Sequence, residues 1–133
     1  MKTISEIINQ EPIYLHNWYP DKRNELIIDF EGVSNIKDLS DVKIKKWDKY
    51  NILFASYGED NYEGDAFVLL EKEGKLYEVN GGHCSCYGLE GQFIIEETTI
   101  ENLEHRLING KLGVENYSDN QFAVELKNFL GIL

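Results

Sequence analysis

The chain has few of the residues that cross-link or stiffen small proteins. Its 133 residues include two cysteines, two prolines, one methionine and three histidines. In the cytoplasm, which is the location expected below, two cysteines are more often free thiols or metal ligands than a disulfide. The sequence has no apolar run long enough for a membrane span. The N-terminus MKTISEIINQ lacks the basic start and apolar middle of a secretion signal, so we expect a cytoplasmic protein.

The remaining composition is typical of one globular domain. Hydrophobic residues make up 42% of the chain and aromatic residues 12%, which is more than disordered chains carry. A chain of this length can bury a core without staples. No repeat or low-complexity linker divides it. We therefore expect a single domain over residues 1–133.

The negative charge is concentrated in the middle third of the sequence. Residues 57–104 hold twelve acidic side chains and two lysines, which is a net charge of −10 out of −11 for the whole chain. Direct contact of this segment with nucleic acid is disfavoured, because the phosphates would repel it. A basic protein surface is the natural complement. The alternative is a solvated acidic face that only keeps the protein soluble.

Hydrophobic patterning and capping residues predict an α+β fold, with an antiparallel sheet and helices packed on it. Thr3 and Glu6 form a capping box that opens a short helix, and Pro12 ends it. Further helices are expected at residues 41–50, from a cap at Thr98 to Gly110, and from Ser118 onwards. Strands are expected at residues 13–16, 26–30, 51–57, 66–70, 75–80 and 93–95. His16 and Trp18 are expected to be packing residues.

The run Gly81–Gly88 (GGHCSCYG) holds both cysteines and one histidine. Sulfur and imidazole ligands favour Zn²⁺. In an extended segment Cys84 and Cys86 point to one side and His83 to the other, unless the glycines turn the chain. His105, in an expected helix, is a further candidate. We predict a metal site of His83, Cys84, Cys86 and His105, which would be structural with all four ligands and open to catalysis with three and a water.

Two other interpretations of this run stay open. The cysteines can be inert buried thiols, or a chance cluster in a turn. Alternatively, Cys84 or Cys86 with His105, oriented by Asn102 or Asn80, would form a thiol hydrolase pair. No strand-to-helix nucleophile elbow surrounds the cysteines, and the acidic setting disfavours a thiolate. A small metal-dependent or cysteine-dependent enzyme acting at this loop is therefore the alternative to a non-enzymatic protein.

The segment YGEDNYEGD (residues 57–65) combines glycines, tyrosines and acids ahead of an expected hairpin turn at Glu73-Gly74. It lacks the register of an EF-hand, and tyrosines among acids suit a protein interface. An ordinary polar loop is the alternative interpretation. The predicted partner-binding residues are Glu59, Asp60, Tyr62, Glu63, Asp65, Glu71 and Glu73.

Parts of the sequence resemble a group of small, mostly uncharacterised phage and prophage proteins of Gram-positive bacteria. The matching stretches are EPIYLHNW, NILFASYG, GDAFVLLEKEGKLYEVNGGHCSCYGLEGQF and EETTIENLEHRL. HCSCYGLEGQ is the most distinctive of these, and residues 108–133 fit less clearly. Such families are similar to a zinc-containing anti-CRISPR inhibitor of type II RNA-guided nucleases.

The resemblance implies a non-enzymatic protein that binds such a nuclease in the host bacterial cell and prevents target DNA from loading. The nuclease holds nucleic acid in a positively charged channel, which would suit an acidic partner. The family pattern suggests the same four residues, His83, Cys84, Cys86 and His105, as zinc ligands. An accessory phage protein that binds itself or another phage product is a third hypothesis.

Overall fold

The computed structural model describes residues 1–59, 62–114 and 121–132. In chain order its elements are α1 (Ile4–Ile8), β1 (Ile13–His16), α2 (Arg23–Glu31), the 3-10 turn η1 (Ile36–Asp38), α3 (Asp41–Asp48), β2 (Asn51–Tyr57), β3 (Gly64–Lys72), β4 (Lys75–His83), β5 (Glu96–Thr98), α4 (Ile100–Asn109) and α5 (Ala123–Leu130). The expected α+β fold is confirmed. None of the helices in the described residues is long and apolar enough to cross a membrane.

The five strands form one mixed sheet in the order β1-β2-β3-β4-β5. Strands β2 to β5 pair antiparallel, as expected, but β1 runs parallel to β2. The reason lies in the connection, because α2 and α3 lie between β1 and β2 and carry the chain back to the same end of the sheet. Strand β5 pairs only with the segment Leu76–Glu78 of β4, so in the described sheet the later part of β4 pairs with β3 on one side and with no strand on the other.

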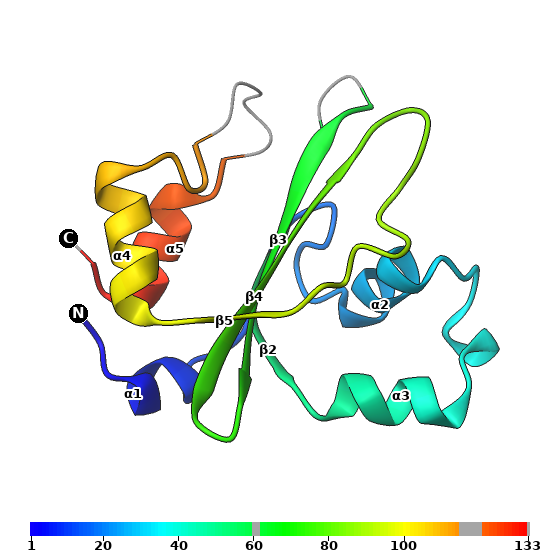
Figure 1. Ribbon diagram of the computed structural model, residues 1–133, viewed down its shortest axis with the longest axis horizontal. Helices are drawn as coiled ribbons and strands as arrows, with labels where there is room; N and C mark the ends of the chain where they lie inside the picture. Colours follow the sequence, from blue (N-terminus) through cyan, green and yellow to red (C-terminus); the bar gives the residue numbers. More distant parts are fainter. Residues whose placement is uncertain (60–61, 115–120, 133) are drawn as a thin grey trace.

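Helices cover both faces of the sheet (Figure 1). On one face α1, α4 and α5 bury a core that includes Phe54, Phe67 and Leu126. On the other face α2, α3 and the β4–β5 connection bury a second core around Trp18 and Trp47. Ring contacts such as Phe67–Phe122, stacked at a centroid distance of 4.9 Å, hold the helices to the strands.

Local capping follows the sequence at several ends. The Thr3–Glu6 capping box is present, with the Thr3 hydroxyl accepting from the Glu6 N–H. Helix α3 begins behind the Ser40 cap, and its lysines lie on the exposed side. Helix α4 is capped by Thr99, one residue after the expected Thr98, and Gly110 follows its last turn as predicted.

Two expected strands are wrong. Residues 26–30 belong to α2, where Leu26, Ile27 and Phe30 are buried at helical spacing and Gly32 ends the helix in the left-handed conformation. A run of five residues, four of them apolar, is too short for its period to separate helix from strand. Residues 93–95 are not a strand, because Phe93 packs on Trp47 at 4.0 Å without joining the ladder. The cap expected at Ser118 lies outside the described residues.

Candidate functional site

The connection after β4 is a closed loop fastened by one side chain, Gln92. Its amide oxygen accepts from the Gly82 N–H at 2.9 Å. Its amide nitrogen donates to the carbonyls of Gly82 and Gly88, both at 2.8 Å. Gln92 therefore imitates the peptide group of a neighbouring strand at Gly82 and draws the far end of the loop towards β4. This loop, residues 84–92, is called the cysteine loop below.

A hollow of about 380 Å³ opens between the cysteine loop and the end of the β2–β3 hairpin. It is lined by Tyr57, Glu59, Tyr62, His83, Cys84, Ser85, Cys86, Tyr87 and Gly88. Tyr62 is 74% exposed and Tyr87 is 64% exposed, so both rings stand at the surface. Cys86 is exposed and Cys84 half-buried, and both are free thiols. The hollow thus combines aromatic, acidic and thiol groups at one end of the sheet.

His83 lines this hollow and is held in place by two contacts. It is 7% exposed, its Nε2 lies 2.7 Å from the Gly58 carbonyl oxygen, and its ring packs on Tyr57 at 4.5 Å. A carbonyl oxygen can only accept a hydrogen bond, so Nε2 must carry the proton. In the neutral ring, Nδ1 is then the nitrogen left to act as a base or a ligand.

A half-buried acid lies behind the hollow. The Asp29 carboxylate accepts from the Trp18 indole N–H at 2.8 Å, and Trp18 stacks on Tyr57 at 4.9 Å. Burial raises the pKa of Asp29, and the indole hydrogen bond only partly offsets this. Burial, together with the negative charges of Asp29 and Glu59, raises the pKa of Tyr57 to about 12. The phenol therefore stays neutral at physiological pH.

The cysteine loop bends back on itself at its thiols. The Cys86 N–H donates to the Cys84 sulfur at 3.3 Å, and the Cys84 N–H donates to the Tyr87 carbonyl at 3.0 Å. The turn therefore holds the two cysteine residues close together, and it does not by itself distinguish metal binding from nucleophilic chemistry at Cys84.

The four predicted metal ligands are not brought together. His105 lies on α4, on the opposite side of the sheet from the cysteine loop (Figure 1), and its Nδ1 accepts from Asn109 at 3.2 Å. In the described ranges, no three His, Cys, Asp or Glu side chains are grouped closely enough to hold a metal ion. His83, Cys84 and Cys86 share one hollow without forming such a group. Zinc binding stays a prediction.

The predicted partner-binding residues divide between two ends of the sheet. Glu59 and Tyr62 line the hollow, Glu63 and Asp65 follow at the same end, and Asp60 lies outside the described residues. Glu73 is exposed in the β3–β4 turn at the other end. The carboxylate of Glu71, a residue only 7% exposed, accepts from the Asn51 amide at 2.7 Å and from the Gly74 N–H at 2.9 Å, which is a structural role.

Sequence reasoning missed two residues of the site, Asp29 and Gln92. Asp29 falls in the strand expected at residues 26–30, and that expectation hid its position behind Tyr57. No catalytic or metal-binding motif includes Gln92, and the sequence indicates it only by its place in HCSCYGLEGQ and by the two glycines at the end of β4. Trp18 is buried, as expected, whereas His16 is exposed and its Nε2 lies 3.0 Å from the Gln121 carbonyl.

Comparison with protein-family models, with curated proteins and with solved structures finds no match to this chain.

Proposed function

We propose that this chain is a non-enzymatic binding protein whose hollow end docks on a basic surface of another protein. The observation that carries the proposal is the pair of exposed tyrosines, Tyr62 and Tyr87, which line one hollow together with the acidic residue Glu59. Tyrosine is enriched at interfaces because it buries a large ring and still offers a hydroxyl. Opposite charge steers the encounter and fixes the register of the two surfaces.

The partner suggested by the sequence resemblance is a host defence protein, a type II RNA-guided nuclease. Its positively charged channel has the complementary sign, and an acidic protein seated there would prevent DNA from loading. On this proposal the chain is a phage or prophage product that acts by occupancy and transforms no substrate. Glu59 and the two tyrosines supply the first contacts.

The test is a DNA-cleavage assay with a purified nuclease–guide complex and increasing amounts of the protein. We expect inhibition by the wild type and at least a tenfold weaker effect for Tyr62→Ser combined with Tyr87→Ser, because central aromatic residues carry most interface energy. Tyr19→Ser is the matched control, since Tyr19 is 65% exposed and does not line the hollow. Equal inhibition by all three proteins, or none by the wild type, would refute the proposal.

Zinc at the cysteine loop is a second proposal, with His83, Cys84 and Cys86 as ligands and without His105. It is favoured by the His83 Nε2–H donating to the Gly58 carbonyl, because histidine ligands usually donate their second ring N–H to such an acceptor. Binding would require the turn at Cys84–Cys86 to close on the ion. Zinc supplied there would hold the loop, and its binding energy would add to folding.

Metal content by mass spectrometry tests this second proposal. We expect about one zinc per chain in the wild type and in His105→Ala, and loss of zinc in His83→Ala and in Cys84→Ser. Loss of zinc in His105→Ala would restore the four-ligand prediction. A metal-free wild type, purified reduced and without chelators, would exclude a resident zinc. Rapid alkylation of Cys84 in that protein would favour the alternative of a thiol enzyme.

A further inference from the structure

Beyond the end of β5, the outer edge of β4 has no strand paired with it in the described sheet. Strand β5 pairs with residues 76–78, whereas β4 continues to His83. The Gly82 N–H and C=O point outward at this edge, where the Gln92 amide meets both. Alternate residues of a strand direct their N–H and C=O to the same side, so the backbone of Asn80 points outward as well. Strand β5 stops short of Asn80, and Gln92 reaches only Gly82.

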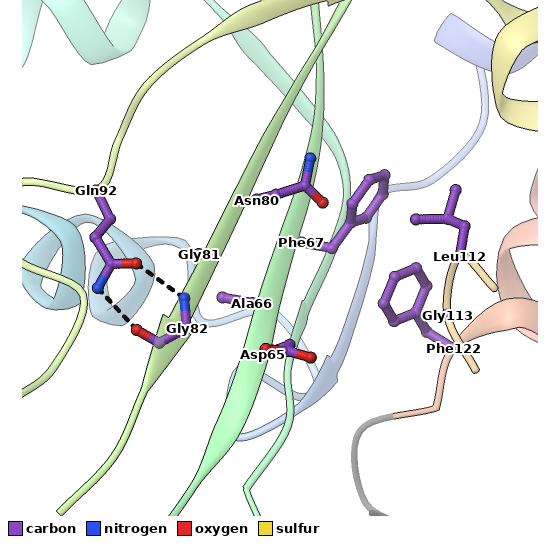
Figure 2. A pocket seen from close by; sticks show the side chains of 10 residues that line it. All are labelled: Asp65, Ala66, Phe67, Asn80, Gly81, Gly82, Gln92, Leu112, Gly113 and Phe122. Atoms are coloured by element: carbon purple, nitrogen blue, oxygen red, sulfur yellow. Dashed lines mark hydrogen bonds between the residues drawn. The ribbon is translucent and has the colours of Figure 1, made fainter. Parts of the chain in front are cut away.

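The edge also has room beside it. A hollow of about 420 Å³ runs along it and is lined by Gln92 on one side of the sheet and by Phe67 and Phe122 on the other (Figure 2). Gly81 and Gly82 contribute no side chains there. A Cβ added to Gly82 would make only ordinary contacts, 3.5 Å from the Asp65 carboxylate. Glycines within a strand often mark a place where another backbone approaches closely.

We propose that the edge of β4 at Asn80–Gly82 takes up an extended basic segment of the partner protein as an added strand, whose backbone replaces the Gln92 amide at Gly82. This inference rests on the proposed function, because it names the kind of segment that the partner would supply. The edge adjoins the tyrosine-bearing hollow at His83, so one partner can cover both. Strand addition supplies backbone hydrogen bonds for affinity, and alternate side chains supply specificity.

Charge and surroundings select lysine or arginine at the position opposite Gly82. Side chains of directly opposed residues share one face of a sheet, so this side chain would lie over Phe67 and Phe122 with its cationic end near Asp65. The aliphatic stem suits the aromatic floor of the hollow, and the cation stays in water. A net charge of −10 in residues 57–104 favours the same choice.

The probe is the peptide acetyl-Lys-Val-Lys-Val-Lys-Val-amide, titrated to about 5 mM into ¹⁵N-labelled protein. We expect shifts of the backbone amides of Asn80, Gly81 and Gly82 and of the Gln92 side-chain amide. A lysine that faces Asp65 also points its own N–H at β4, because directly opposed residues exchange both bonds. N-methylation of the lysine nitrogens should therefore weaken binding at least tenfold, whereas N-methylation of the valine nitrogens should leave it within about twofold.

Gly82→Val is the protein variant, because its side chain would fill the hollow while the strand keeps its partners. We expect a dispersed spectrum like that of the wild type and at least tenfold weaker binding of the unmodified peptide. Equal binding of both N-methylated peptides, shifts confined to Tyr62 and Tyr87, or no shifts at all would overturn strand addition. The peptide titration and the DNA-cleavage assay are independent. If the peptide does not bind as a strand but nuclease inhibition still depends on Tyr62 and Tyr87, strand addition is refuted and the proposed function is not.

Discussion

Replacing Gln92 with alanine should open the cysteine loop and destabilise the domain. The side chain makes three hydrogen bonds, one from the Gly82 N–H and one each to the carbonyls of Gly82 and Gly88. A neutral hydrogen bond contributes about 1 kcal/mol net, so the loss is about 3 kcal/mol if nothing replaces the amide. Water reaching the partly buried edge would reduce this to about 2 kcal/mol.

Urea unfolding measures the loss, and hydrogen exchange at the Gly82 amide locates it. Gln92→Glu is an informative companion, because its carboxylate can accept from Gly82 but cannot donate to either carbonyl. At pH 7 we expect it to cost at least as much as alanine, with partial recovery in acid as the carboxyl gains a proton. Gln121→Ala is the exposed control and should change stability by less than about 0.5 kcal/mol. A loss of that small size for Gln92→Ala, with the Gly82 amide still protected, would refute the role assigned to Gln92.

Two further changes test the charges inside the fold. Arg106→Met leaves the Glu78 carboxylate, in a residue only 5% exposed, without its 2.7 Å partner, and urea unfolding should show a loss of about 3 kcal/mol at pH 7. Burial raises the pKa of Glu78, but hydrogen bonds from Arg106 and other donors outweigh it and the pKa is lowered, so this stability is present above about pH 4.5 and lost as pH falls through the folded value. Asp29→Asn keeps an acceptor for the Trp18 indole and removes a carboxyl whose pKa burial raises, so the variant should be more stable than the wild type at pH 7 and not at pH 3. An Arg106→Met variant as stable as the wild type at pH 7 would contradict the role of the ion pair. An Asp29→Asn variant as stable as the wild type at both pH 7 and pH 3 would contradict the effect assigned to Asp29.

The parts of the fold predicted from sequence are those with a strong local signal. The β2 and β4 strands, the hairpin between β3 and β4, and the capping box at Thr3 follow from patterning and turn chemistry. The helical state of residues 26–30 depends on tertiary packing of Phe30 against Trp18 and Trp47, which no local pattern records.

The same contrast between local pattern and tertiary packing holds for the candidate site. The sequence indicates the cysteine loop because its residue types are rare in this chain, and it indicates the acidic end of the β2–β3 hairpin beside it. The separation of His105 from the loop was not visible, because it depends on which face of the sheet α4 covers. The buried role of Glu71 depends on its partners Asn51 and Gly74, which only the sheet register brings together.

The central claim is that the hollow end of the sheet, and not acidity in general, binds the partner. The most direct test is the affinity of a purified type II nuclease–guide complex for two variants of equal charge, Glu59→Lys/Glu63→Lys at the hollow end of the sheet and Glu73→Lys/Glu101→Lys at the far end. The account predicts at least a tenfold loss for the first pair, less than about threefold for the second, and weaker binding of the wild type as salt rises. Equal losses for the two pairs, or no binding by the wild type at about 10 μM, would contradict it.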